Sequence, residues 1–333
     1  MRCSMQNARV SIMRDSKSEM EFSVLPNRKE DEVILHVKAC GICGSDIPRI
    51  FANHAYYYPI VIGHEFSGEV FDSEGKALNG KRVSVFPIIP CKECEFCQKG
   101  LYANCTNYNY YGSRCDGGLQ EYIAIKTENL VELPDNVSFE VGAMLEPVSV
   151  CLHAVKKAMI QKDEDVLIYG AGTIGLLCAM WAKDFGAKNI YLVDIDDKKL
   201  EFAESLGFSR YCGESIQVVL ECSGAGACLN KAIENVDAFG RIVLVGNAGG
   251  DMVIQVNNYA KVLRKQLTIF GSWNSDFSFA VNDWKESVQA ISEKRIHPEA
   301  LITHVFSLHE WDKVLNVIKN REFFNKIMVV NKQ

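Results

Sequence analysis

A short apolar strand, a glycine-rich turn and a helix follow one another in the middle of the chain. The strand covers Asp165–Tyr169, the turn is GAGTIG at 170–175, and the helical run continues to Lys183. A second strand, Asn189–Val193, ends in Asp194. A G-x-G-x-x-G pattern is weak alone, but a strand before it, a helix after it and an acid about 20 residues on make it specific. The segment predicts a parallel strand–helix–strand unit that binds a dinucleotide.

The glycine turn would hold the pyrophosphate of this cofactor. Glycines allow a tight turn and a close approach of the backbone, and the helix N-terminus favours negative charge. Asp194 would accept hydrogen bonds from the adenosine ribose hydroxyls and would repel a 2′-phosphate, so NAD is favoured over NADP. The cofactor contacts predicted in this unit are Gly170, Gly172, Thr173, Ile174, Gly175 and Asp194.

Three more strands continue the unit. Residues 218–224, 240–246 and 267–271 are nearly all apolar and end at small residues, as buried parallel strands do. Ligands bind outside the carboxyl ends of such strands. Val245 and Gly271 are therefore expected on the nicotinamide side of the cofactor.

The N-terminal half has a different pattern. Alternation at Val33–Val37 is strand periodicity, with Val33, Leu35 and Val37 on one face. Short apolar strands separated by Gly and Pro predict a small β-rich domain or partial barrel. These strands are Pro59–Ile62, Gly68–Phe71, Arg82–Phe86 and Tyr122–Ile125. The C-terminal tail from Trp284 predicts a helix, a strand at Ile302–Phe306, a helix through Val317 and a last strand at Ile327–Val330.

Four cysteines are clustered at 91–105. Cys91, Cys94 and Cys97 fall at three-residue intervals, and Cys105 follows eight residues later. Thiolates separated by two residues can reach one metal ion, and four sulfurs complete a tetrahedron around Zn²⁺. Because no coordination position stays open for a substrate, the cluster predicts a structural zinc site.

A second metal site is predicted from separate segments. Cys43 and His64 offer a soft thiolate and an imidazole, a common start to a zinc site. Glu146 adds a carboxylate in the apolar segment LEPVSV, where a metal ion would satisfy its charge. Three such ligands and a water give the open coordination of catalytic zinc. Asp46 would fix the imidazole tautomer, and Glu65 would be a fourth ligand or would exchange with the water.

Composition restricts the class of protein. The length of 333 residues fits two domains, and the net charge of −6 provides no electrostatic footprint for nucleic acid or an acidic membrane. No stretch approaches the roughly 18 apolar residues of a membrane span, and the N-terminus has no signal-peptide pattern. Thirteen cysteines in such a chain predict reduced metal ligands and buried thiols in a cytoplasmic protein.

The motifs GICGSD, GHEFSG, C-x2-C-x2-C-x7-C, LEPVSV and GAGTIG, in this order, resemble the zinc-dependent medium-chain dehydrogenases over essentially the whole chain. The resemblance implies an α/β protein: a GroES-like catalytic domain at 1–147 and 274–333, and a Rossmann NAD-binding domain, with a doubly wound parallel sheet, at 148–273. It implies two zinc ions per subunit and hydride transfer from a polyol to NAD. It also implies a homodimer or homotetramer.

The resemblance assigns roles to individual residues. Cys43 and His64 match two catalytic zinc ligands, Glu146 matches the carboxylate ligand of the polyol branch, and Glu65 matches the acid beside the ligand histidine. Ser45 matches the hydroxyl that relays the substrate proton. Lys199 matches a basic residue near the adenosine ribose.

Further segments resemble a branch that oxidises a hexitol phosphate. They are Cys43–Phe51, Tyr57–Ile60, Tyr111–Arg114, Leu263–Lys265 and Gly271–Trp273. Arg49 and Arg114 are candidates to bind a substrate phosphate, since guanidinium matches its charge and geometry. A free polyol or a simple alcohol stays open as the alternative substrate.

The chain departs from the family pattern at three places. Pro48 stands where many alcohol and sorbitol dehydrogenases have a histidine that shuttles the proton; the hexitol-phosphate branch shares this proline. The region between Ser209 and Val218 is short, so a helix usual between the third and fourth Rossmann strands is expected to be reduced or lost. The loop from Phe71 to Lys81 is also short.

Overall fold

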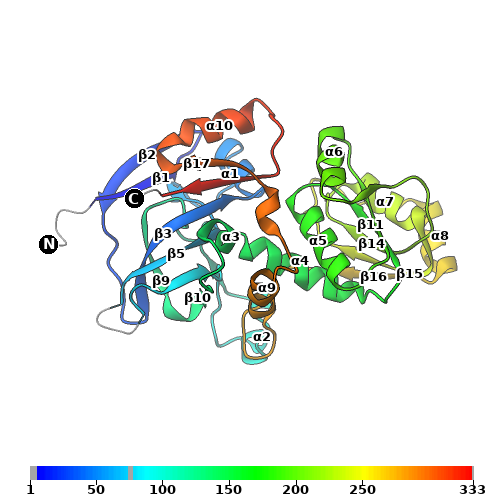
Figure 1. The fold of residues 1–333 in the computed structure, drawn as a ribbon, viewed down its shortest axis with the longest axis horizontal. Helices are drawn as coiled ribbons and strands as arrows, with labels where there is room; N and C mark the ends of the chain where they lie inside the picture. The colour runs from blue at the N-terminus through cyan, green and yellow to red at the C-terminus, as the bar shows by residue number, and fades with distance from the viewer. Residues whose placement is uncertain (1–5, 74–77, 332–333) are drawn as a thin grey trace. The chain divides into compact units, whose positions relative to one another are not determined.

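The computed structural model describes residues 6–73 and 78–331, and the chain divides into two compact units (Figure 1). The first comprises residues 1–146, 276–293 and 298–333, and the second comprises 147–275 and 294–297. Both chain ends therefore contribute to the first unit. The domain boundaries expected from the sequence stay a prediction.

The first unit is built on antiparallel β-structure. Its largest sheet has seven strands, with β3 at the centre, paired to β5, β9 and the C-terminal β18. Side chains of Val33, Leu35 and Val37 on β3 are fully buried, which confirms the expected inward face. The strands of this sheet are β3 (Glu32–Ile42), β5 (Glu65–Asp72), β6 (Arg82–Val85), β9 (Tyr122–Lys126), β10 (Leu130–Glu132), β17 (Ile302–Ser307) and β18 (Lys326–Val330).

Smaller elements complete the first unit. A three-stranded sheet has the order β2-β1-β4, and β7 pairs with β8. These strands are β1 (Gln6–Ile12), β2 (Ser18–Val24), β4 (Ile60–Val61), β7 (Ile88–Ile89) and β8 (Asn109–Tyr110). Its helices are α1 (Asp46–Phe51), α2 (Glu95–Gln98), α3 (Phe139–Ala143), α9 (Asp283–Ser292) and α10 (Trp311–Lys319), while α4 (Leu145–Ala158) begins here and continues into the second unit.

The second unit contains a six-stranded parallel sheet with the order β13-β12-β11-β14-β15-β16. Numbered from its first strand, this is the 3-2-1-4-5-6 order of a Rossmann fold, so the predicted fold class is confirmed. Figure 1 shows α5 and α7 on opposite faces of the sheet. The strands are β11 (Asp165–Tyr169), β12 (Asn189–Val193), β13 (Ser209–Arg210), β14 (Ile216–Glu221), β15 (Val236–Leu244) and β16 (Thr268–Gly271); the helices are α5 (Thr173–Asp184), α6 (Asp197–Ser205), α7 (Gly226–Asn235) and α8 (Val256–Lys265).

The short region between the third and fourth Rossmann strands contains no helix. β13 ends at Arg210 and β14 begins at Ile216, so the predicted loss of this helix is confirmed. The short loop expected from Phe71 to Lys81 includes residues 74–77, which lie outside the described residues. Among the described residues, no helix is both long and apolar enough to cross a membrane.

Candidate active site

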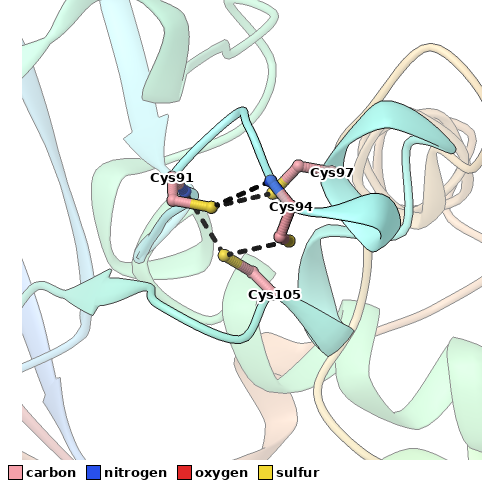
Figure 2. A group of neighbouring side chains, drawn as sticks. All are labelled: Cys91, Cys94, Cys97 and Cys105. Atoms are coloured by element: carbon pink, nitrogen blue, oxygen red, sulfur yellow. Dashed lines mark hydrogen bonds between the residues drawn. The ribbon is translucent and has the colours of Figure 1, made fainter.

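Four cysteines converge at α2 in the first unit. Figure 2 shows the thiols of Cys91, Cys94, Cys97 and Cys105 turned toward one another, all four sulfurs lying within 4.8 Å of each other. The Sγ atoms of Cys91 and Cys97 are 3.9 Å apart, and those of Cys94 and Cys105 are 4.0 Å apart. Sulfurs bound tetrahedrally at about 2.3 Å from one zinc ion lie about 3.8 Å apart. The cluster therefore fits a closed zinc site.

Backbone amides stabilise thiolates in this cluster. The amide of Cys91 donates to Cys105 Sγ at 3.3 Å, and the amide of Cys94 donates to Cys91 Sγ at 3.4 Å. Hydrogen bonds from the Cys97 and Thr106 amides lower the pKa of the Cys94 thiol. These bonds favour the deprotonated form that binds metal.

A second group of ligand atoms lies between β3 and β5. Cys43 follows the end of β3, whereas His64 and Glu65 stand at the start of β5. One ligand atom from each of the three lies within 4.8 Å of the others. Since β3 and β5 are paired through Gly41 and Glu65, the sheet register brings the GICGSD and GHE segments together.

Glu146 is close to this group but is not part of its 4.8 Å set. It lies in the first turn of α4, where it is buried and accepts a hydrogen bond from Tyr110 Oη at 3.2 Å. Burial raises the pKa of Glu146, and the charge of His64 acts against that rise. The ring of Tyr110 also contacts His64 edge-on, with centroids 5.8 Å apart. Tyr110 thus links the glutamate to the imidazole.

Asp46 is fully buried behind His64. Its Oδ1 atom lies 3.7 Å from His64 Nδ1, and its Oδ2 atom accepts a hydrogen bond from the Cys43 amide at 3.1 Å. No described group forms a hydrogen bond with His64 Nδ1. Because Asp46 stands on the Nδ1 side of the imidazole, Nε2 is the nitrogen left for a metal ion. The role of Asp46 in fixing the imidazole tautomer stays a prediction.

Glu65 forms an ion pair with Lys326 of β18. The ammonium group lies 2.8 Å and 2.6 Å from the two carboxylate oxygens, and it also donates to the Ile42 carbonyl at 3.3 Å. Both side chains are at most 3% exposed. A Cβ atom at Gly41 would come within 2.3 Å of Glu65 Oε2, so only glycine leaves room for this carboxylate.

The charges of this group fit a divalent cation. Lys326 pairs with Glu65 and Arg49 pairs with Asp46, but Glu146 forms no ion pair in the described part of the chain. Burial alone lowers the pKa of His64, yet Asp46 and Cys43 outweigh burial and raise it to about 10. Such a buried excess of negative charge is costly unless a cation balances it.

The dinucleotide motif has the predicted geometry in the second unit. Gly170 follows β11 and has a φ of 99°, and Gly172 is the N-cap of α5. A Cβ atom at Gly175 would lie 1.8 Å from the Gly170 carbonyl oxygen, whereas one at Gly172 would meet nothing within 4 Å. Gly175 therefore allows the helix to pack on the turn, and Gly172 leaves the backbone open to a ligand.

Asp194 follows β12 and supports the same turn. Its Oδ2 atom accepts a hydrogen bond from the Ala171 amide at 2.8 Å, and its Oδ1 atom accepts one from the Asp196 amide at 3.0 Å. Lys199 is half-buried on α6, Val245 follows β15, and Gly271 ends β16. The parallel sheet places all these residues at or after carboxyl ends of its strands, where Rossmann folds bind ligands.

Sequence reasoning missed three residues at these sites: Tyr110, Lys326 and Glu221. Glu221 ends β14, is fully buried, and accepts hydrogen bonds from the Ser223 and Gly224 amides at 2.9 and 3.0 Å. The sequence could have identified Glu221, because a carboxylate at the end of a nearly all-apolar strand is unusual. No local pattern marks Tyr110 or Lys326, because their partners are distant in sequence.

Two family models match the chain. The model described as "Alcohol dehydrogenase GroES-like domain" matches residues 29–135, and the model described as "Zinc-binding dehydrogenase" matches residues 173–293. The first covers the β3–β5 group and the four cysteines, and the second covers α5 and the later Rossmann strands.

Curated relatives and solved structures agree with the models. Galactitol 1-phosphate 5-dehydrogenase of Escherichia coli (strain K12) is 35% identical over 330 residues, covering 92% of this chain and 95% of the relative. L-idonate 5-dehydrogenase of Vitis vinifera is 32% identical over 317 residues, covering 87% and 84%. The crystal structure of galactitol-1-phosphate dehydrogenase from Escherichia coli has a TM-score of 0.89 at 34% identity, covering 97% and 99%. The chain therefore belongs to the zinc-dependent medium-chain dehydrogenases, among the polyol dehydrogenases of that family.

Proposed function

We propose that this enzyme oxidises a secondary hydroxyl of a sugar alcohol phosphate with NAD as the hydride acceptor. Galactitol 1-phosphate, oxidised to tagatose 6-phosphate, is the first candidate substrate. The proposal is carried by Cys43 together with the buried His64 and Glu146, in a chain 35% identical to galactitol 1-phosphate 5-dehydrogenase. It is also supported by the intact dinucleotide turn in the second unit.

Two zinc ions per subunit would serve different roles. Cys91, Cys94, Cys97 and Cys105 would hold a structural ion, because their four sulfurs fill its coordination sphere. The other ion would be held by Cys43, His64 and Glu146, with Glu65 or water as the fourth ligand. When bound, this ion supplies Lewis-acid chemistry that makes the substrate hydroxyl more acidic.

The remaining chemistry belongs to side chains of the first unit. Ser45 would receive the hydroxyl proton and pass it to water; it acts as a relay, because a serine pKa is too high for a final base. Tyr110 would hold Glu146 in place through its hydrogen bond. The ion pair with Lys326 fixes the Glu65 carboxylate in position. This supports the proposed place of Glu65 beside the ligand histidine.

NAD is the proposed cofactor. Asp194 is already oriented by the Ala171 amide beside the glycine turn, where its charge would disfavour a 2′-phosphate. A solved alcohol dehydrogenase from Escherichia coli CFT073, whose structure contains NADH, has a TM-score of 0.88 at 26% identity, covering 98% of this chain and 99% of that one. A zinc-binding dehydrogenase from Sinorhizobium meliloti 1021 with the same TM-score, at 25% identity, is bound to NADP, so the choice of NAD rests on Asp194.

The two candidate phosphate ligands differ in availability. The Arg49 guanidinium is occupied by Ser45, Asp46 and Ser113. Arg114 lies 4.1 Å from the centre of the Tyr108 ring and 4.9 Å from that of Tyr56. Within residues 6–73 and 78–331, its one hydrogen bond goes to the Tyr108 carbonyl oxygen. Arg114 is thus the better candidate. The guanidinium group of Arg49 already has partners. If Arg114 does not bind a phosphate either, the favoured substrate is the alternative class, a free polyol.

Steady-state NADH formation tests the substrate and cofactor together. Galactitol 1-phosphate, galactitol and sorbitol would be compared with NAD and with NADP. We expect kcat/KM to be highest for the phosphate with NAD and to fall selectively for the phosphate in Arg114→Met. Equal kcat/KM on the free polyols would refute the phosphate assignment and leave a polyol dehydrogenase.

A homodimer or homotetramer is also proposed. Strand β16 is the last strand of its sheet, and α8 exposes Val256, Tyr259 and Leu263 on one face at helical spacing. An open strand edge beside exposed apolar side chains favours association between copies. Light scattering that gives the 37.3 kDa mass of a single chain would contradict this proposal.

A further inference from the structure

Arg49 lies on α1, and its guanidinium group forms hydrogen bonds with three residues. Its Nη1 atom donates to the Ser45 carbonyl at 2.9 Å, to Ser45 Oγ at 3.1 Å and to Asp46 Oδ1 at 3.0 Å. Its Nη2 atom donates to Ser113 Oγ at 3.2 Å. The side chain is 15% exposed, and its charge is paired with the fully buried Asp46. Arg49 therefore has the contacts of a structural side chain rather than a free anion ligand.

These contacts determine the role of the Ser45 hydroxyl. A guanidinium group has only donors, so Ser45 Oγ must accept the bond from Arg49. The hydroxyl keeps its own proton for another partner, and Ser45 Oγ donates no hydrogen bond to any described residue. The Ser45 hydroxyl can therefore still donate its proton in a hydrogen bond, while Arg49 occupies one of the two lone pairs on its oxygen.

Pro48 and the helical backbone of Ser45 (φ −71°, ψ −15°) both act against a capping bond from the Ser45 side chain. Ser45 is the N-cap residue of α1, and an N-cap serine commonly accepts a bond from the amide three residues later. That residue is Pro48, which has no amide hydrogen, and the Ser45 side chain forms no capping bond. The hydroxyl is thereby left available to Arg49.

We propose that Arg49 is a positioning residue that holds the Ser45 hydroxyl as a proton-relay donor and ties it to the Ser113 loop, and that Arg49 does not bind the substrate phosphate. This inference rests on the relay role of Ser45 in the proposed function. The Ser113 loop is the turn at 112–114, shortly after Tyr110, whose hydroxyl holds Glu146. Arg49 therefore connects the Ser45 relay to the segment that supports a metal ligand.

Four variants of the zinc-loaded enzyme test the proposal: Arg49→Met, Arg49→Lys, Ser45→Ala and Arg49→Met with Ser45→Ala. Turnover is measured on galactitol 1-phosphate and on galactitol, and zinc content is measured by mass spectrometry. Arg321→Met, a change at an exposed arginine on a surface turn, is the matched control. Crystal structures of the wild type and of Arg49→Met report the Ser45 side-chain rotamer without any substrate.

We expect Arg49→Met to lower kcat by about tenfold to a hundredfold on both substrates, since a positioned proton-transfer group contributes at least that much. KM for the phosphate and the zinc content stay unchanged, Arg49→Lys recovers part of kcat, and Ser45 changes rotamer in Arg49→Met. The double variant is no slower than Ser45→Ala, because Arg49 acts through Ser45.

A selective rise in KM for the phosphate would overturn the proposal in favour of a phosphate ligand. Multiplicative losses in the double variant, loss of zinc, or an unchanged Ser45 rotamer would also overturn it. If Arg49→Met does not fold, Arg49→Lys and Ser113→Ala provide the same comparisons. Absence of polyol oxidation by the wild type would refute the proposed function, and the rotamer comparison would still decide the role of Arg49.

Discussion

Two cations, the partly exposed Arg49 and the buried Lys326, neutralise two of the carboxylates around the candidate metal group. Arg49 pairs with Asp46, and Lys326 pairs with Glu65. Glu146 is the carboxylate left beside Cys43 and His64, which matches the ligand set expected from the family. The division of charge thus marks Glu146 as the carboxylate whose charge a zinc ion would balance.

Lys326→Met should destabilise the first unit strongly. The change leaves Glu65 buried with no cation at hydrogen-bond distance, and breaking a buried pair from one side costs about 3–5 kcal/mol. Thermal unfolding should show a large fall in Tm. Adding Glu65→Gln should recover at least half of this fall, because the uncompensated charge is removed; a double variant as unstable as Lys326→Met would contradict the explanation.

Asp194→Ala should weaken NAD and relax the discrimination against NADP. The carboxylate would contribute charge-assisted hydrogen bonds to the ribose, and losing such bonds costs about 1.5–3 kcal/mol, or roughly ten- to a hundredfold in affinity. Fluorescence titration with NADH and NADPH measures both affinities. Asp197→Ala on the exposed start of α6 is the control. An unchanged ratio of the two affinities would exclude Asp194 as the ribose ligand.

At the scale of helices and strands, the local sequence pattern was most informative where backbone atoms themselves form the candidate binding site. The strand at Asp165–Tyr169 was predicted correctly, whereas α5 begins at Thr173, inside the glycine turn predicted at 170–175. Gly170 has a positive φ, and a Cβ atom at Gly175 would collide with the Gly170 carbonyl oxygen. The register of β3 on β5 was not predictable, since it depends on pairing between segments about thirty residues apart. That register brings Glu65 beside Cys43.

Lys265→Met should loosen the packing of α7 against α8. The Lys265 ammonium donates to the carbonyls of Ile233 and Glu234 at 3.3 and 2.9 Å, at the C-terminal end of α7, and to that of Val236. Carbonyls there have no partner within the helix, so removing the donor should cost about 1–2 kcal/mol. Urea unfolding of the second unit measures this loss.

Lys261→Met is the matched control for Lys265→Met, one helical turn earlier. Its ammonium group lies 3.9 Å from a Glu234 carboxylate oxygen, and the Lys261 side chain is 40% exposed. Surface pairs of this kind contribute little, so the stability of this variant should stay within about 0.5 kcal/mol of the wild type. Equal losses in the two variants would show that the three carbonyl contacts are not responsible.

At the scale of the whole molecule, the two metal sites should fail differently. Cys43→Ala should abolish turnover and lower zinc from about two to about one per subunit, with little change in Tm. Cys97→Ser should remove the other ion and lower Tm, because a structural site contributes folding energy. Zinc analysis and thermal unfolding separate the two outcomes; full activity in Cys43→Ala would contradict the assignment of the catalytic site.

The sequence by itself determined the family, the Rossmann unit, the missing helix before Val218 and the four-cysteine site. These features are encoded within short segments, where spacing alone limits what the backbone and the ligands can do. Only the tertiary structure decided that Lys326 holds Glu65, that Tyr110 holds Glu146 and that Arg49 reaches Ser113. Lys326 lies 261 residues from Glu65, and Tyr110 lies 36 residues from Glu146, so their contacts depend on strand pairing and loop packing. Charge and burial at the metal group are properties of that packing, which no local pattern specifies.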